Sequence, residues 1–473
     1  MGESRRKFLR QGACALAGSA AFAASVERLS LIRALARSAS DATDYKALVC
    51  VFLEGGNDGA NTIVPYDDYN ATGGYASVRG ASGLAIPKAD LLALSPPSGQ
   101  GLKFGLHPNL VELQSLFNNQ KLAVLCNTGT LVQPVTRALF QSGVGHPYQL
   151  FSHSDQVNQQ QTVVATEPGQ TGWGGRISDL MTSVNGTAPL PMAISTAGAS
   201  LFTTGAATRN LVINPEVRLN EVLRVDYGTD FPAGAGSLAA RRLAYEKIRT
   251  DGGGKLVNVA ADIIGQAIRA GEAIPTDPVL PPVQAGQTDF PDTKLGNQLK
   301  QIAKLISIRA NLGVHRQIFF CSLDGFDHHT SQHNALNGHD VLLLQLSRAL
   351  KAFYDATINL GVAGQVTTFT LSDFGRTFEP SGSGAGVGSD HAWGNHHLIL
   401  GDAVRGGDFY GVYPVLALGG PDDADERGRF IPTTSTDQYA ATLALWFGLA
   451  PADVPAVFPF IGRFATPNLN FML

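Results

Sequence analysis

Continuous apolar runs of strand length alternate along this chain with segments of helical spacing. The runs occupy residues 47–53, 121–126, 317–323, 365–371 and 397–400. Apolar residues recur at helical intervals in 108–119, 295–312 and 333–359, and again in a segment that begins with Asp437 as its predicted N-cap. Strand, helix, strand units form parallel sheets whose strands are buried on both faces. The pattern therefore predicts an α/β fold with a doubly wound, mostly parallel sheet and helices on both faces.

Two segments interrupt this alternation. Residues 68–101 and 227–292 contain glycine and proline stretches without a periodic pattern, apart from predicted helices at 238–249 and 255–270. Neither segment carries an apolar pattern large enough for a core of its own. We interpret both as loop-rich insertions in a single domain that spans residues 45–473.

The amino terminus has the features of an export signal. Paired arginines in SRRKFLR precede a run of small and apolar residues at 12–24 that is too short to span a bilayer. This pattern is typical of a twin-arginine signal. It predicts a signal peptide at 1–24, a linker at 25–44 and a periplasmic or secreted protein. Because this route exports folded proteins, often with a cofactor already bound, it also favours a metal or cofactor.

Composition and charge exclude several classes. Of 473 residues, 44% are hydrophobic and 16% charged, which favours a large folded core over disorder. The formal charge is −4, without the basic excess that nucleic-acid binding requires. Loss of four basic residues and one acidic residue with the signal would change it to −7. The mature chain has no predicted transmembrane segment, and its three cysteines, Cys50, Cys126 and Cys321, are predicted to be small buried apolar residues.

Carboxylates and histidines follow several of the predicted strands. Asp58 comes after the first, Asp327 and His329 after the third, and Asp373 after the fourth, while His391 closes a glycine-rich loop before the last. The carboxyl ends of parallel strands share one edge, where ligands bind in such sheets. Asp and His suit a divalent ion, zinc first and otherwise manganese, magnesium or calcium. Two such ions about 4 Å apart could stabilise displacement at phosphorus or sulfur.

The order of several short motifs resembles a bacterial secreted family, domain-of-unknown-function family 1501. The motifs are SRRKFLRQ, VFLEGGNDGANTIVPY, HPNLVEL, SHSDQ, GWGGRISDLM, GFDHHTSQH, LSDFGRTFEPSG and DHAWGNHHLILGDAVRGG. Most of them extend over residues 47–420, which is nearly the whole predicted mature chain. The family is similar to the alkaline phosphatase and sulfatase superfamily of metal-dependent hydrolases, so the resemblance implies an alkaline phosphatase-like fold and, by analogy only, the reaction.

The resemblance also implies roles for individual residues. Asp58 would match the first-strand metal ligand of the superfamily. Asp327 and His329 would match the Asp and His of one metal site, Asp373 would match an Asp of the other, and His391 would match the late His of the superfamily. The nucleophile would be Ser152, beside His153 at a helix start where its pKa is lowered, with Thr128 and Ser154 as alternatives. Arg376 could bind a tetrahedral oxyanion or pair with Asp373.

The chain departs from the superfamily pattern at two positions. Phe374 follows Asp373 where the superfamily often has histidine, so one metal ligand is missing or is supplied by His153 or Asn57. The sequence Gly-Phe-Asp-His-His replaces a common Gly-Phe-Asp-Thr-His, which leaves open whether His328 or His329 faces the metal. A site with one metal ion or none also remains open.

Two hypotheses follow. The first is an exported metal-dependent hydrolase of phosphate or sulfate esters, with a small-molecule or polysaccharide ester as substrate. The second is a catalytically degenerate exported protein that uses the same scaffold to bind a glycan or to assemble with a protein partner in the envelope. The density of Asp and His at strand ends favours the hydrolase, and Phe374 favours the binding protein.

Overall fold

The computed structural model describes residues 44–99, 101–208, 210–219 and 276–473, together with a few positions between 240 and 274. The predicted signal at 1–24 lies outside the described residues, as does the predicted linker at 25–44 except for Asp44. Most of the predicted insertion at 227–292, including most of both helices predicted there, also lies outside them.

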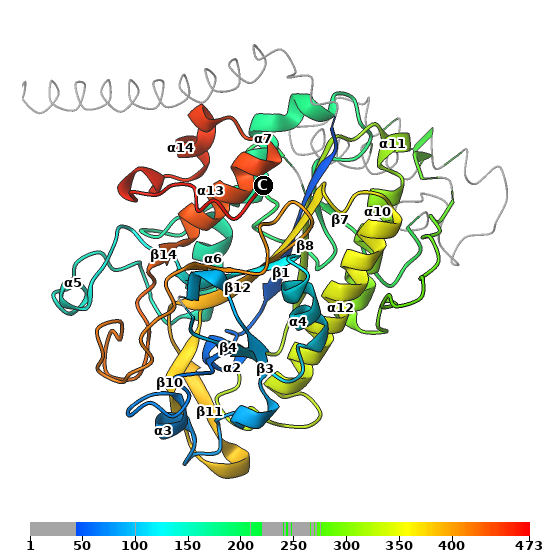
Figure 1. Cartoon of the computed structure of the whole chain (residues 1–473). Helices are drawn as coiled ribbons and strands as arrows, with labels where there is room; N and C mark the ends of the chain where they lie inside the picture. The colour runs from blue at the N-terminus through cyan, green and yellow to red at the C-terminus, as the bar shows by residue number, and fades with distance from the viewer. Residues whose placement is uncertain are drawn as a thin grey trace, which may run out of the picture.

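Nine described strands form one sheet in the order β13-β5-β12-β9-β1-β8-β6-β7, with β14 also paired to β5 (Figure 1). In its middle, β1 (Lys46–Leu53) runs parallel to β9 (Val366–Ser372) and to β8 (Arg316–Leu323). The other strands are β5 (Leu122–Gly129), β6 (Ala193–Ser195), β7 (Leu211–Val212), β12 (Asn395–Leu400), β13 (Phe409–Gly411) and β14 (Thr434–Ser435). All five predicted apolar runs are thus strands of this sheet.

One strand runs against its neighbours. β12 is antiparallel to both β5 and β9, whereas the remaining pairings of the sheet are parallel. The sheet is therefore mixed and mostly parallel. Because of this reversal, the amino end of β12 lies at the edge where β1, β8 and β9 have their carboxyl ends. Residues just before Asn395 consequently reach the same edge as residues just after the three parallel strands.

Helices pack on both faces of the sheet, as predicted (Figure 1). One face is covered by α4 (Val111–Asn118), α10 (Lys294–Ser307) and α12 (His339–Asn359), and the other by α7 (Trp173–Met181), α13 (Thr436–Phe447) and α14 (Val454–Val457). Along β1, Val49 and Val51 face the first group of helices, and Cys50 and Phe52 the second. Burial on both sides explains why the strand is continuously apolar. No described helix combines the length and apolar composition needed to cross a membrane.

The three cysteines outside the predicted signal are buried and form no disulfide, as the sequence predicted.

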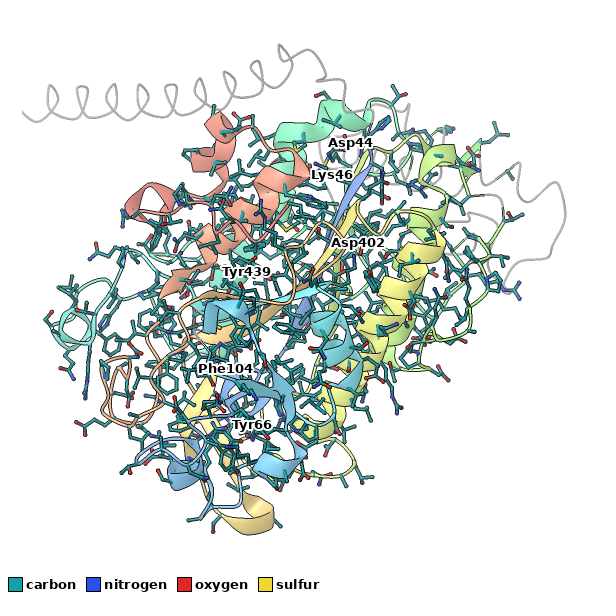
Figure 2. The ribbon with its side chains drawn as sticks, viewed as in Figure 1. Asp44, Lys46, Tyr66, Phe104, Asp402 and Tyr439 are labelled. Atoms are coloured by element: carbon teal, nitrogen blue, oxygen red, sulfur yellow. The ribbon has the colours of Figure 1, made fainter. Side chains whose placement is uncertain are left out.

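Two small sheets lie beyond the large one. The first is antiparallel and contains β2 (Ile63–Pro65), β4 (Phe104–Leu106) and β3 (Leu92–Leu94); the second is the hairpin of β10 (Arg376–Ser381) and β11 (Gly388–His391). The segment predicted as an insertion at 68–101 supplies β3 and α3 (Tyr75–Arg79). In Figure 2, Asp44 and Lys46 mark the amino end of β1 near the top, and Tyr66 lies near these small sheets at the bottom.

The remaining short helices are α2 (Gly59–Thr62), α5 (Arg137–Gln141), α6 (His153–Thr162) and α11 (Arg309–Leu312).

Four predicted helix boundaries were wrong. The helix predicted at 108–119 begins at Val111 instead, with Leu110 as its N-cap. The helix predicted at 295–312 is divided at Ile308 into α10 and α11. The helix predicted from residue 333 begins at His339, directly after Gly338. The N-cap of α13 is Ser435 and not Asp437, because the Ser435 side chain and Gln438 form a reciprocal capping box.

Asp437 in the first turn of α13 makes stability depend on pH. Burial raises the pKa of Asp437 to about 7, although hydrogen bonds from Ser435 and the backbone of Phe460 lower it. The unfolded chain releases this proton at about pH 4. The contribution of Asp437 to the free energy of unfolding therefore decreases as the pH rises from about 4 to about 7, and it is constant above about pH 7. A comparison of the free energies of unfolding of Asp437→Asn and the wild type at two pH values tests this. The difference in favour of Asp437→Asn should increase by on the order of a few kcal/mol from pH 4.5 to pH 8. Urea unfolding of both proteins at pH 4.5 and pH 8 measures this difference in the free energy of unfolding. The same difference at both pH values would contradict the raised pKa of a buried Asp437 carboxylate.

Candidate metal centre

The carboxyl edge of the sheet brings together six of the predicted site residues, including Arg376, which pairs with Asp327. Asp327 and His329 follow β8, and Asp373 follows β9. His391 ends β11 and reaches this edge because β12 begins there. His153 is the first residue of α6, whose N-cap is Ser152.

Three imidazole nitrogens converge on one carboxylate oxygen. The Oδ1 atom of Asp327 lies 3.4 Å from Nε2 of His153, 3.1 Å from Nε2 of His329 and 3.5 Å from Nε2 of His391. The Nε2 atoms of His329 and His391 are 2.8 Å apart. We call these four residues the His3Asp cluster; their ligand atoms all lie within 4.8 Å of one another.

The opposite nitrogen of each ring is held by an acceptor outside the cluster. Nδ1 of His153 lies 2.8 Å from Asp373 Oδ2, and Nδ1 of His329 lies 2.8 Å from Asp390 Oδ1. Nδ1 of His391 lies 2.7 Å from the carbonyl oxygen of Phe151. Carboxylate and carbonyl oxygens only accept, so each Nδ1 carries a proton, and in its neutral form each ring presents an Nε2 lone pair to the cluster. Histidine ligands of metal ions are held in the same way.

The cluster therefore consists of acceptors that face one another. Nε2 of His153 is buried and has no hydrogen-bond partner among the described residues. Three lone pairs and a carboxylate repel one another unless a proton or a metal ion lies between them. The donor set of three imidazoles and one carboxylate suits a tetrahedral zinc ion and is less suited to magnesium or calcium, which prefer oxygen.

Neighbouring charges favour the ionised state of the carboxylate. Burial opposes ionisation of Asp327, but the hydrogen bond and charge of Arg376 hold its pKa below the usual value. Burial lowers the pKa of His391, which favours the neutral ring. The hydrogen bond to Asp373 raises the pKa of His153, so this ring is the first of the two to gain a proton as the pH falls. An ionised carboxylate and neutral imidazoles are the forms that bind metal ions.

Arg376 pairs with a different residue from the one predicted. Its Nη1 atom donates to Asp327 Oδ1 at 2.7 Å and to the carbonyl of Gly55 at 3.2 Å, and Nη2 donates to the carbonyl of Ser389. The predicted alternative of an ion pair with Asp373 is thus replaced by an ion pair with Asp327. The side chain is 1% exposed, so the guanidinium is enclosed by protein, although its Nε atom has no hydrogen-bond partner among the described residues.

Asp58 lies apart from the cluster. Its carboxylate forms an ion pair with Arg79 Nη1 at 2.7 Å, accepts from Gln332 Nε2 at 2.7 Å and caps α2 through the backbone of Asn61. The Asp58 and Arg79 side chains are 1% and 0% exposed. The Arg79 guanidinium therefore already neutralises the carboxylate of Asp58, which was predicted to be a metal ligand.

His153 and Asn57, which were predicted as alternatives for the ligand missing at Phe374, lie in different places. His153 belongs to the cluster, whereas Asn57 Oδ1 lies 2.9 Å from Nε2 of His339 on α12. Asp373 holds His153 and accepts from the backbone of Gly55. Phe374 is buried, and its ring centre lies 4.8 Å from those of His153 and His391. The phenyl ring thus packs against two rings of the cluster.

The remaining alternatives also differ in position. His329 faces the cluster, while Nε2 of the half-buried His328 lies 3.0 Å from the carbonyl of Asn337. Thr128 lies on β5 and is fully buried, whereas Ser154 is exposed on α6. The Ser152 hydroxyl donates to Asp155 Oδ2 at 2.5 Å.

A second group of donors, His107, His339 and Asp340, does not have the proton arrangement of a metal site. Nδ1 of His107 accepts from the backbone N–H of Asn109 at 3.1 Å, so the proton of the neutral ring is on Nε2. That Nε2 donates to Asp340 Oδ1 at 2.9 Å. A protonated nitrogen cannot bind a metal ion. The same carboxylate also lies 3.0 Å from Nδ1 of His333, which makes this group a buried hydrogen-bond network.

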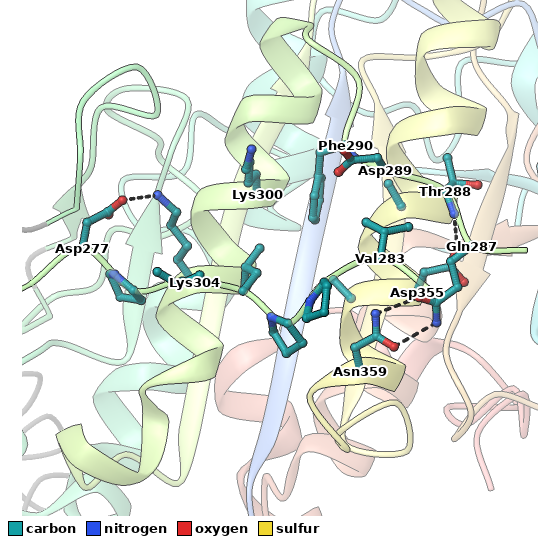
Figure 3. Close-up of a pocket in the computed structure, with 17 residues that line it drawn as sticks. Asp277, Val283, Gln287, Thr288, Asp289, Phe290, Lys300, Lys304, Asp355 and Asn359 are labelled. Atoms are coloured by element: carbon teal, nitrogen blue, oxygen red, sulfur yellow. Dashed lines mark hydrogen bonds and ion pairs between the residues drawn. The ribbon is translucent and has the colours of Figure 1, made fainter. Parts of the chain in front are cut away.

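A cavity of about 420 Å³ lies away from the candidate residues, between α10, α12 and the segment 277–290 (Figure 3). Lys304 pairs with Asp277 at one end, and Asn359 exchanges hydrogen bonds with Gln287 at the other. None of the cluster residues lines this cavity.

The sequence did not reveal two of the hydrogen-bond acceptors that orient the imidazole rings of the cluster. Asp390 directly precedes His391 in the sequence but was not expected to be the partner of His329, and Phe151 was not identified. The carboxylate of Asp390 could have been suspected from its position, since histidine ligands commonly donate to carboxylates. A backbone carbonyl such as that of Phe151 leaves no signal in the sequence.

Loss of the carboxylate that holds His329 should weaken metal binding without abolishing it. We expect Asp390→Ala to lower the affinity for Zn²⁺ by about 10- to 100-fold, because His329 loses the acceptor that fixes its proton. Glu379→Ala is the matched control: Glu379 binds the same Arg427 as Asp390 but contacts no cluster residue. Competition with a chromophoric chelator measures both variants, and equal losses in the two would contradict this role of Asp390.

Comparison with solved structures finds distant likenesses. Ps i-CgsB in complex with k-i-k-neocarrahexaose is 9% identical, with 90% of this chain and 77% of that chain covered and a TM-score of 0.35. PsFucS1 sulfatase from Pseudoalteromonas sp. is 10% identical, with 91% and 72% covered and a TM-score of 0.33. The C-terminal periplasmic domain of EcEptC from Escherichia coli, in a complex with Zn, is 10% identical, with 76% and 73% covered and a TM-score of 0.28. At these TM-scores the likenesses assign no activity or substrate to this chain.

None of the curated proteins matches the sequence. The sequence model of the family described as "Protein of unknown function (DUF1501)" matches residues 45–423.

Proposed function

This chain belongs to the DUF1501 family, and we propose that it is an exported metal-dependent hydrolase of phosphate or sulfate esters. The observation that carries the proposal is the His3Asp cluster, in which three Nε2 lone pairs and one carboxylate oxygen face a common point at the carboxyl edge of the sheet.

We propose that the cluster holds one divalent ion, with zinc first and manganese, magnesium or calcium as alternatives. When bound, such an ion supplies a Lewis acid that polarises a phosphoryl or sulfuryl oxygen. The side chains of Asp327 and His329 are 47% and 44% exposed, so an ester in solution can approach the cluster. Asp58 was predicted as a ligand as well; its ion pair with Arg79 gives no support for a second ion.

Ser152 is the proposed nucleophile, and two observations support it. It precedes the cluster residue His153 at the start of α6, and its hydroxyl already donates to Asp155. Ser152 Oγ would form a bond to phosphorus or sulfur while the bond to the leaving alkoxide breaks; Asp155 would take the hydroxyl proton, and the alkoxide would take a proton from water. Water then cleaves the seryl ester and releases phosphate or sulfate. Arg376 would act through Asp327, whose charge it stabilises.

The substrate class is a small-molecule or polysaccharide ester outside the cytoplasm. The twin-arginine pattern supports export to the periplasm or beyond, since this route carries folded proteins with bound cofactors. A protein partner in the envelope is compatible with this location.

A second function is favoured by one observation. The four protein groups of the cluster would supply all four ligands of a tetrahedral zinc ion and leave no open position, which is typical of structural zinc. Together with Phe374 in place of a ligand, this supports a catalytically inactive exported protein that binds a glycan or a protein partner.

Turnover and metal content of the purified mature chain distinguish the two functions. We expect about one divalent ion per chain and hydrolysis of an aryl phosphate or aryl sulfate that stops with a chelator and returns with Zn²⁺. A bound ion without turnover of either ester supports the binding protein. Absence of both contradicts the metal centre itself.

The nucleophile has its own test. Acid quenching during turnover of an aryl phosphate should leave a phosphoryl group on the peptide that contains Ser152, as peptide mass spectrometry would detect. The label should persist in Ser154→Ala and disappear in Ser152→Ala. The reverse pattern would assign the nucleophile to Ser154.

A further inference from the structure

Phe151 adopts a backbone conformation that is unfavourable for an aromatic residue. Its φ angle is 69°, in the left-handed region where the Cβ atom of an L-residue is crowded by its own backbone. Such conformations persist only where surrounding contacts determine them, and they occur preferentially at functional sites. Phe151 directly precedes Ser152 and His153, so its conformation sets the path of the chain into α6.

Both backbone polar groups of Phe151 are bound to the surroundings of the cluster. The carbonyl oxygen accepts from Nδ1 of His391 at 2.7 Å. The N–H donates to Oε1 of the fully buried Gln156, one turn into α6, at 2.6 Å. Several other non-glycine residues of the described chain have a positive φ angle, but among them only Phe151 accepts a hydrogen bond from a cluster ring through its carbonyl.

The side chain of Phe151 is held by Arg429. The guanidinium of Arg429 lies 4.2 Å from the centre of the phenyl ring, which places the cation over the ring face. Its Nε atom donates to the carbonyl of His391 at 2.8 Å, and Nη1 pairs with Asp425 at 2.6 Å. One arginine therefore contacts both the residue that holds His391 and the backbone of His391 itself.

From this geometry we infer that Phe151 and Arg429 are positioning residues of the metal centre. Arg429 fixes the phenyl ring and thereby the left-handed backbone of Phe151. That backbone orients the imidazole of His391 through its carbonyl and directs His153 into the cluster through the start of α6. Two ligands from segments about 240 residues apart are thus aligned by a single strained residue. The inference rests on the proposed metal centre and adds to it the residues that set its affinity and geometry.

Metal affinity and the visible d–d spectrum of the Co²⁺ form test the inference in the mature chain. We expect Arg429→Gln and Phe151→Ala each to weaken Co²⁺ and Zn²⁺ binding by about 10- to 100-fold. Both should also shift the Co²⁺ spectrum, which reports the arrangement of the ligands. Phe151→Tyr retains the ring and should keep the wild-type affinity and spectrum. Arg463→Gln is the matched control, because Arg463 lies 4.8 Å from the ring centre of Phe460 in a similar contact outside the cluster.

The outcomes separate this inference from the proposed function. Wild-type affinity and spectrum in both Arg429→Gln and Phe151→Ala would overturn the positioning role and leave the metal centre intact. Equal losses in Arg463→Gln would overturn it as well, because the effect would then be general. A wild-type chain that binds neither ion would remove the proposed metal centre and the inference with it. If Phe151→Ala does not fold, Arg429→Gln, which leaves residue 151 unchanged, still decides between these results.

Discussion

Asp327→Asn is expected to lower the affinity for Zn²⁺ by more than about 100-fold, which exceeds the usual loss from a residue that only holds a ligand. Ester hydrolysis at micromolar Zn²⁺ should be lost with it. The amide removes the negative charge on which the three imidazole nitrogens converge, while its oxygen can still accept from Arg376. The chain should therefore remain folded. Metal content after dialysis and turnover of aryl esters measure the two effects.

The control for this variant is Asp324→Asn. Asp324 lies three residues before Asp327 and pairs with Lys294 in an exposed ion pair, without contact to the cluster. We expect wild-type metal content and turnover in this variant. Full metal content in Asp327→Asn would show that the ion is bound elsewhere and would contradict the His3Asp cluster.

Arg79→Met should destabilise the fold by about 3–5 kcal/mol, because it leaves the buried carboxylate of Asp58 without its partner. The guanidinium also donates to the side chain of Asn61 and to the carbonyls of Phe378 and Thr377. Arg79 thus joins α3 to β10 as well as neutralising Asp58. Chemical unfolding gives the loss directly.

A double-mutant cycle separates the ion pair from the other contacts of Arg79. Asp58→Asn combined with Arg79→Met should lose less stability than the two single variants together, since neither charge is then left buried alone. Lys294→Met, which breaks an exposed ion pair, should cost at most about 1 kcal/mol. Asp58→Asn should retain the metal content of the wild type. Loss of the ion in this variant would restore Asp58 as a ligand.

Much of the fold could be predicted because the central strands are buried on both faces. That burial makes β1, β8 and β9 continuously apolar, and their parallel order places Asp327 and Asp373 at one edge. The direction of β12 could not be predicted in the same way. An apolar run does not reveal which way a strand runs, and the reversal is what brings His391 to this edge.

The contribution of α6 to the metal centre could not be predicted from the spacing of apolar residues. The helix is buried through Gln156, Gln159 and Gln160, so it lacks the apolar stripe that predicts a core helix. Hydrogen bonds to Thr130 and Thr436 take the place of apolar contacts. For this reason His153 was expected beside the nucleophile and only as one alternative for a missing ligand.

The role of Asp58 could not be predicted because its ion-pair partner, Arg79, comes from a segment without a periodic apolar pattern. Asp58 was expected to bind a metal ion because it follows the first strand. Arg79 lies in the segment at 68–101 that was interpreted as a loop-rich insertion, and nothing in its spacing indicates a fully buried guanidinium. A carboxylate at a strand end is therefore a weak indication of a ligand until the nearest cation is known.

Anomalous diffraction at the zinc absorption edge, from crystals of the mature chain grown with Zn²⁺, tests the metal centre most directly. The account predicts one strong peak bounded by His153, Asp327, His329 and His391, within about 2.0–2.2 Å of three Nε2 atoms and one carboxylate oxygen. A peak between Asp58 and Asp373, or no peak at the His3Asp cluster, would contradict it.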